Sequence, residues 1–146
     1  MFERFRRWID GVGPRARIVV AEDDPEMRAL LAAALRRDGY EVIEVSDGAQ
    51  LWEYLHAVMH RADVAAPDLL VSDVRMPGQS GLEVLAALRR AEVGLPVVLI
   101  TAFGDAEAHD AAFELGAAML DKPFDLDTLR RTVHCLVGDT LERDLG

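Results

Sequence analysis

The sequence predicts an α/β protein built around a parallel β-sheet. Five strand-like apolar runs alternate with helix-like stretches, which is the pattern of consecutive βαβ units. The runs are apolar throughout, as expected of strands that are buried on both faces. The 146 residues are enough for one domain with its own hydrophobic core. We expect the strands near residues 17–21, 41–45, 68–72, 97–101 and 118–120.

Each expected helix has a recognisable start. Asp24 before Pro25 is typical of an N-cap followed by a first helical position. Asp47–Gln50 resembles a capping box, and Ser80–Glu83 is a better example of one. The fourth and fifth helices can be capped by Asp105 and Asp125. These signals place one helix after each of the five strands.

The charge of the chain is unevenly distributed. The net charge of −10 argues against non-specific binding to nucleic acid, so we expect no direct nucleic-acid partner. Residues 1–16 form a basic N-terminal extension, which is followed by a domain at 17–138 and a polar C-terminal tail at 139–146. The extension is either a disordered or surface-packed segment or a short amphipathic helix that contacts a partner or a membrane surface.

Cysteine content and hydropathy indicate the compartment. Cys135 is the single cysteine, which excludes an internal disulfide and fits a reducing environment. No apolar stretch reaches membrane-spanning length, and residues 1–10 lack the apolar core of a signal peptide. We therefore expect a cytoplasmic protein without a membrane span.

Four of the apolar runs end in residues that can bind a phosphoryl group or a cation. The first run ends at Glu22, Asp23 and Asp24, and the third ends at Asp73. The fourth and fifth runs end at Thr101 and at Lys122, the latter being the only lysine among 16 basic residues. Because the carboxyl ends of parallel strands meet at one edge of a sheet, we expect these side chains to converge there.

Converging carboxylates repel one another, so they either acquire raised pKa values or need a cation. Oxygen ligands without histidine or cysteine favour Mg²⁺ over zinc, with Mn²⁺ as an alternative ion. Asp24 is assigned to its helix cap, which leaves Glu22 and Asp23 as the metal pair. The alternative interpretation of these adjacent acids is a capped loop that binds no metal.

The other three strand-end residues each have two interpretations. Asp73 is either a nucleophile of aspartyl-phosphate chemistry or a strand-ending residue before the turn at 77–78. Lys122 is either a surface lysine or the counter-charge to the acids and to a phosphoryl oxygen. Thr101 is either the last β-branched residue of its strand or a hydrogen-bond donor to that oxygen.

These residues together resemble the receiver domain of two-component response regulators. The resemblance runs from about residue 17 to 137 and is carried by four strings, VVAEDDPEMR, VSDVRMPGQSGLEVL, ITAFGD and DKPFD. They contain Glu22–Asp23, Asp73, Thr101–Ala102 and Lys122–Phe124. The resemblance implies a flavodoxin-like (βα)₅ fold with strand order 2-1-3-4-5 and, at this length, a stand-alone receiver.

The resemblance also implies a mechanism. Asp73 would accept a phosphoryl group from the phosphohistidine of a sensor kinase or of a histidine phosphotransfer protein. Mg²⁺ would be held by Asp23, by Asp73, by Glu22 through water and by the backbone carbonyl of Arg75. Such a protein is not an enzyme in the ordinary sense, since it only phosphorylates and dephosphorylates itself.

The same resemblance assigns the remaining site residues. Lys122 would pair with the new phosphoryl group, and Thr101 would move toward it as the switch. Ala102 and Phe103 follow Thr101, and we expect Phe103, together with Arg75, to cover the phosphoryl group and slow its loss. These roles make the segment after the fourth strand the reporter of phosphorylation.

One position departs from the family pattern. Met119 stands three residues before Lys122, where the family usually has an aromatic residue that swings inward on activation. We therefore expect activation to run through Thr101 and the flexible Met119 rather than through an aromatic ring.

The function that we expect is a phospho-acceptor signalling protein. Its output protein would bind the face made by the fourth helix, the fifth strand and the fifth helix, and this face could also serve in a homodimer. The alternatives are an interaction module that works without phosphorylation and a Mg²⁺-dependent phosphohydrolase with an aspartate nucleophile. A hydrolase would usually need a second acid just after Asp73, where this chain has Arg75.

Overall fold

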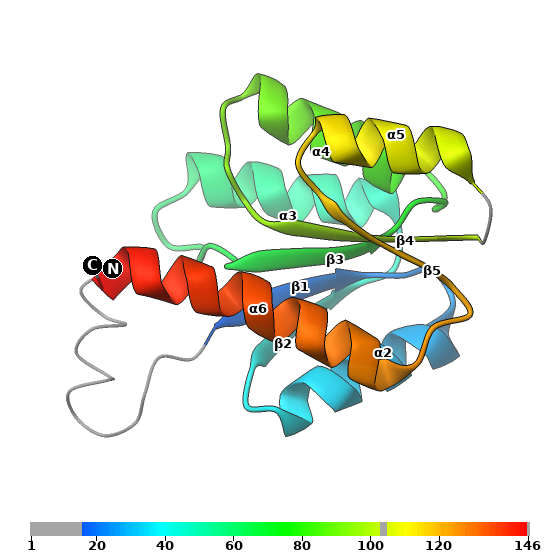
Figure 1. Ribbon diagram of the computed structural model, residues 1–146. Coiled ribbons are helices and arrows are strands. Elements are labelled where there is room, and N and C mark those ends of the chain that lie inside the picture. The colour runs from blue at the N-terminus through cyan, green and yellow to red at the C-terminus, as the bar shows by residue number, and fades with distance from the viewer. Residues whose placement is uncertain (1–15, 103–104, 146) are drawn as a thin grey trace.

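A computed structural model describes residues 16–102 and 105–145 of the chain, with side chains as far as residue 138. Five parallel strands form one sheet in the order β2-β1-β3-β4-β5, which confirms the flavodoxin-like prediction (Figure 1). The strands are β1 (Arg17–Ala21), β2 (Glu41–Val45), β3 (Leu69–Asp73), β4 (Val97–Ala102) and β5 (Ala118–Lys122). The expected basic extension and Phe103 lie outside the described residues, apart from Ala16.

The five described helices follow the five strands. They are α2 (Pro25–Arg37), α3 (Gly48–His60), α4 (Gly81–Arg90), α5 (Ala106–Glu114) and α6 (Leu126–Leu145). The backbone of α6 therefore continues through most of the segment expected as a polar tail at 139–146. Each helix lies between two strands of the sequence or after the last one, so the strands all run in the same direction.

Side-chain N-caps lie at the starts of the helices, where the sequence predicts them. Asp24 accepts a hydrogen bond from the Glu26 amide, and Asp105 accepts one from the Ala108 amide. Ser80 and Glu83 form both halves of a capping box. The caps of α3 and α6 are made by Asp47 and Asp125. At Asp47 only half of the expected capping box forms, because the Gln50 side chain accepts from Ser46 instead.

The sheet is buried between two layers of helices (Figure 1). Alternate residues along each strand point to opposite faces, so β1 contributes Ile18 and Val20 to one core and Val19 and Ala21 to the other. The first core is closed by α2 and α6, and the second by α3, α4 and α5. Burial on both faces explains why the strands are continuously apolar.

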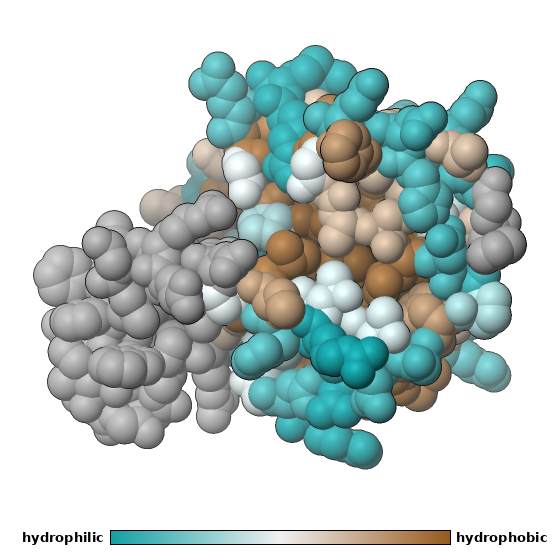
Figure 2. Space-filling view, in the orientation of Figure 1, coloured by the Kyte–Doolittle hydropathy of each residue, from teal (hydrophilic) through white to brown (hydrophobic). Residues whose placement is uncertain are grey.

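Hydrophilic side chains cover most of the helix surfaces that face the viewer in Figure 2, while hydrophobic ones gather over β5 between α5 and α6. All five residues of β5 are partly exposed, because this strand is at an edge of the sheet. Phe113 of α5 is 85 % exposed, the most of any large hydrophobic residue in the described part of the chain. None of the described helices is long and apolar enough to cross a membrane.

Candidate functional site

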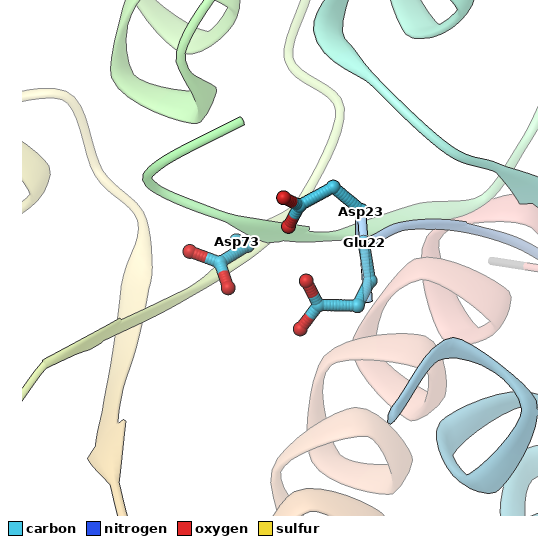
Figure 3. Close-up of side chains that lie close together, drawn as sticks. All are labelled: Glu22, Asp23 and Asp73. Atoms are coloured by element: carbon cyan, nitrogen blue, oxygen red, sulfur yellow. The ribbon is translucent and has the colours of Figure 1, made fainter. Parts of the chain in front are cut away.

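Three carboxylates converge at the carboxyl edge of the sheet (Figure 3). Glu22 and Asp23 follow β1, and Asp73 is the last residue of the neighbouring strand β3. One carboxylate oxygen from each lies within 4.8 Å of the others. Glu22 and Asp73 are buried and Asp23 is exposed, so the cluster opens to solvent on the Asp23 side.

The Asp73 carboxylate is fixed by its surroundings. Its Oδ1 accepts a hydrogen bond from the backbone amide of Arg75 at 2.9 Å. Its main-chain carbonyl accepts a hydrogen bond from the Ser72 hydroxyl at 2.9 Å. Behind it, the start of α4 comes so close that a Cβ on Gly81 would lie 2.6 Å from the Asp73 carbonyl oxygen. The side chain therefore projects from a rigid strand end.

Lys122 supplies the positive charge of the site. Its Nζ donates a hydrogen bond to Asp73 Oδ2 at 2.6 Å and lies 3.7 Å from Glu22 Oε1. Burial lowers the pKa of Lys122, but the hydrogen bond and charge of Asp73 and the charge of Glu22 outweigh this effect and raise it. The lysine is therefore a fixed cation between two of the three acids.

The surroundings of Glu22 disfavour its ionised form. Burial, reinforced by the negative charge of Asp73 and opposed by Lys122, raises the pKa of Glu22 from 4.5 to about 7. Its Oε1 is buried and has no hydrogen-bond partner among the described residues. A buried, unsatisfied carboxylate oxygen beside two further carboxylates is a donor set that fits a hard divalent cation.

The remaining predicted residues lie around this centre. Thr101, in β4, is 2 % exposed, and its hydroxyl donates to Asp105 Oδ2 at 3.4 Å rather than to the acid cluster. The Arg75 side chain is 82 % exposed, with its guanidinium 3.8 Å from Asp105 Oδ2. Asp105 thus faces both residues that we expect to respond to a phosphoryl group.

Two further predicted residues belong to β4 and β5. Met119 pairs with Leu99 in the sheet and is partly buried against the core that α3, α4 and α5 cover. Ala102 pairs with Lys122 and lines a pocket of about 390 Å³ next to that lysine. The other walls of this pocket are Met27, Pro123 and Phe124. An apolar pocket therefore adjoins the charged site.

The structure adds residues that the sequence did not indicate. Arg28 of α2 donates from Nη1 to the carbonyl oxygen of Glu22 at 2.8 Å. On the other side of the site, His109 of α5 lies 2.7 Å from Asp121 of β5. The strand ends predict the acids themselves, but no pattern in the sequence predicts these two contacts of the neighbouring helices.

Comparison with known proteins identifies the family. The family model for the response regulator receiver domain matches residues 18–134. The transcriptional regulatory protein TcrA of Mycobacterium tuberculosis is 45% identical over 121 residues, which are 82% of this chain and 45% of TcrA. The chain thus spans about half the length of this curated relative.

Solved structures agree with this result. The chemotaxis response regulator CheY4 of Vibrio cholerae superposes with a TM-score of 0.72 at 26% identity, over 84% of this chain and 98% of that one. The response regulator TrrA of Thermotoga maritima, in complex with Mg²⁺ and BeF, superposes with a TM-score of 0.70 at 28% identity. That match covers 83% of this chain and 98% of TrrA. On sequence, topology and structural likeness together, the chain belongs to the response regulator receiver domain family.

Proposed function

We propose that this chain is a phospho-acceptor of two-component signalling, with Asp73 as the residue that receives the phosphoryl group. The observation that carries the proposal is the geometry of Asp73, which lies beside two acids and hydrogen-bonds Lys122 at 2.6 Å. A carboxylate with this surrounding can attack phosphorus, since phosphoryl transfer needs positioning and charge neutralisation more than covalent help.

The donor that we propose is a phosphohistidine on a sensor kinase or a histidine phosphotransfer protein. An oxygen of Asp73 forms a bond to phosphorus while the bond from phosphorus to the imidazole nitrogen breaks, and the electron pair of that bond stays on the imidazole. Lys122, already within reach of Asp73, then pairs with a phosphoryl oxygen. Hydrolysis of the acyl phosphate later returns Asp73 to its starting state.

The acid cluster is the proposed magnesium site. Asp23 and Asp73 would bind the ion directly, Glu22 through water, and Arg75 through its backbone carbonyl oxygen. When bound, Mg²⁺ neutralises the negative charge that gathers between Asp73 and the incoming phosphoryl group. The likeness to TrrA, whose structure contains Mg²⁺ and BeF, supports this assignment.

We further propose that Thr101 reports the phosphorylated state. To donate to a phosphoryl oxygen on Asp73, its hydroxyl has to leave Asp105. Helix α5 starts at the cap made by Asp105, so this exchange occurs at the entrance to α5. The face of α5, β5 and α6, with exposed Phe113, is the proposed binding surface for an output protein or for a second copy of the chain.

The test is incubation with Mg²⁺ and a small acyl-phosphate donor, followed by intact-mass measurement. We expect a gain of one phosphoryl group that disappears in Asp73→Asn. The matched control is Asp24→Asn, which lies next to the site but keeps its helix cap and should keep the gain. No gain in the wild-type chain would favour an interaction module, and continuous release of phosphate would favour a hydrolase.

A further inference from the structure

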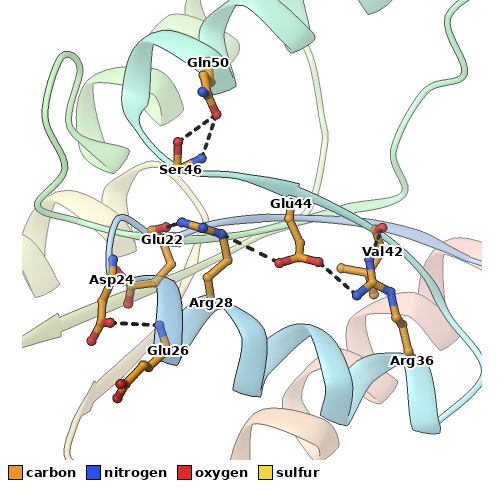
Figure 4. Close-up of polar contacts among 9 residues, drawn as sticks. All are labelled: Glu22, Asp24, Glu26, Arg28, Arg36, Val42, Glu44, Ser46 and Gln50. Atoms are coloured by element: carbon orange, nitrogen blue, oxygen red, sulfur yellow. Dashed lines mark hydrogen bonds and ion pairs between the residues drawn. The ribbon is translucent and has the colours of Figure 1, made fainter.

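We infer that Arg28 is a positioning residue for the acid cluster, because it fixes the peptide group that joins Glu22 to Asp23. This inference rests on the proposed function, since it concerns the same magnesium site. The relevant contacts lie behind the site, between β1, the start of α2 and the edge strand β2 (Figure 4).

The backbone around Glu22 is held on both sides. Its amide donates to the Val45 carbonyl of β2 at 3.2 Å, and its carbonyl accepts from Arg28 Nη1 at 2.8 Å. The peptide group is planar, so fixing this carbonyl also fixes the direction in which the chain enters Asp23. The hydrogen bond and the ion pair of Arg28 thus go to a backbone carbonyl and to Glu44 rather than to the three carboxylates of the cluster, yet they fix the backbone that carries two of these carboxylates.

The guanidinium of Arg28 is itself held at a second point. Its Nε lies 3.7 Å from Glu44 Oε1, while the other oxygen of Glu44 accepts from Arg36 at 2.9 Å. Arg36 also donates to the Val42 carbonyl at 3.1 Å. Arg28 and Arg36 lie about two turns apart on α2, so one carboxylate of β2 engages both (Figure 4). The planar fork of an arginine suits such a two-point contact better than an ammonium does.

An electrostatic role and a positioning role of Arg28 predict opposite effects of its substitution on Mg²⁺ affinity. Arg28 is a cation near a cation site, so removing its charge should by electrostatics alone strengthen Mg²⁺ binding. Removing its hydrogen bond to Glu22 should instead let the backbone between Glu22 and Asp23 relax, which weakens binding. The sign of the change in affinity therefore separates a positioning role from a purely electrostatic one.

The experiment is calorimetric titration of the full chain with Mg²⁺, without any phosphodonor. We expect Arg28→Gln to weaken the Kd about tenfold, the lower end of the effect of losing a partner that orients metal ligands. The matched control is Arg36→Gln, which loses the other half of the Glu44 contact but touches nothing at Glu22, and its Kd should stay at the wild-type value. Thermal unfolding of the metal-free variants measures any structural loss separately.

A second variant covers the case in which Arg28→Gln does not fold. Glu44→Gln frees one end of the Arg28 side chain and should weaken Mg²⁺ binding in the same direction, but by less. A Kd that is unchanged or tighter in the folded variants, or equally weakened in Arg36→Gln, would overturn the positioning role alone. Absence of Mg²⁺ binding in the wild-type chain would overturn the proposed function together with it.

Discussion

Asp23 and Asp24 are adjacent acids with different surroundings. Asp24 accepts a hydrogen bond from the Glu26 amide at 3.0 Å and so caps α2. Asp23 has an oxygen within 4.8 Å of both Glu22 and Asp73. The dipeptide Asp24–Pro25 already predicts the cap, because proline is favoured at the first helical position. One side chain thus stabilises the fold while its neighbour is available to a ligand.

We predict that alanine substitutions separate these two roles. Asp24→Ala should lower the free energy of unfolding by about 1 kcal/mol, the usual value of an N-cap, and leave the Mg²⁺ affinity nearly unchanged. Asp23→Ala should weaken Mg²⁺ binding and should leave the metal-free stability at or above the wild-type value, because it relieves repulsion among the acids. Urea unfolding and calorimetric titration measure the two quantities, and a similar loss of affinity in both variants would contradict the division.

The sequence predicts some of these side chains better than others. Glu22, Asp23, Asp73 and Lys122 can be found because each lies within two residues of the end of an apolar run, and parallel strands bring such ends together. The contacts of Arg28 depend on side-chain conformation and on the distant strand β2. No local pattern records them, so only the folded structure shows them.

Close packing of α4 against the end of β3 fixes the position of Asp73. Gly81 is the first residue of α4, and a Cβ there would approach both the Asp73 carbonyl and the Ser72 hydroxyl to less than 3.0 Å. The first of these contacts is with a backbone atom, which cannot move away by a change of rotamer. A glycine at this position therefore permits the close approach of the helix to the strand that ends in Asp73, the proposed phospho-acceptor.

We predict opposite effects for two glycine substitutions. Gly81→Ala should lower the free energy of unfolding by about 1–3 kcal/mol, as overpacking does, and should also reduce phosphorylation of Asp73. Gly138→Ala, in α6, meets no atom within 4 Å and should raise stability by about 0.5–1 kcal/mol through helix propensity. Equal stabilities of the two variants in denaturant unfolding would refute the close-packing argument.

Helices α2 and α6 are joined by a two-point ion pair. Arg130 of α6 donates to both oxygens of Asp38, the C-cap of α2, at 2.7 and 2.8 Å. These hydrogen bonds lower the pKa of Asp38 below its ordinary 3.8. The partners are 92 residues apart in the sequence, which explains why helix patterns predicted both helices but not their contact.

We predict that the contribution of this pair depends on pH. A carboxyl group whose pKa is lower in the folded state stabilises the fold above its unfolded pKa, and this stabilisation is lost as the pH falls through the folded value. Wild type should therefore exceed Arg130→Gln in stability at neutral pH, and the difference should shrink below the ordinary pKa of Asp38. Arg61→Gln, which breaks a pair within one loop, is the control, and a difference constant with pH would argue against the assignment.

The architecture followed from the sequence more fully than the details of the site. Continuous apolar runs predicted all five strands to within two residues at each end, since burial between two helical layers demands such runs. The observed strands β4 and β5 extend further, to Ala102 and Lys122, because backbone pairing continues past the last apolar residue. The strand order came from the family resemblance, and the structure confirms it.

We predict that Mg²⁺ stabilises the entire domain. An ion that binds only the folded state adds RT ln(1 + [Mg²⁺]/Kd), which is about 2.7 kcal/mol at a hundredfold excess over Kd. Thermal unfolding should therefore shift upward with Mg²⁺ and return on chelation, with NaCl at equal ionic strength as the control. The shift should be smaller in Asp73→Asn, and a wild-type unfolding temperature that does not change with Mg²⁺ would exclude the proposed magnesium site.

The charged groups of the site come from the ends of β1, β3 and β5, which are brought together only in the finished sheet. Lys122 belongs to the last of them, and its contacts with Asp73 and Glu22 require β3, β4 and β5 to be in register. A nascent chain that lacks β5 has the acids but not their counter-charge, and a misfolded chain has neither in place. Under the proposed function, acceptance of a phosphoryl group therefore requires a correctly folded sheet, so unfolded and misfolded molecules would not be phosphorylated.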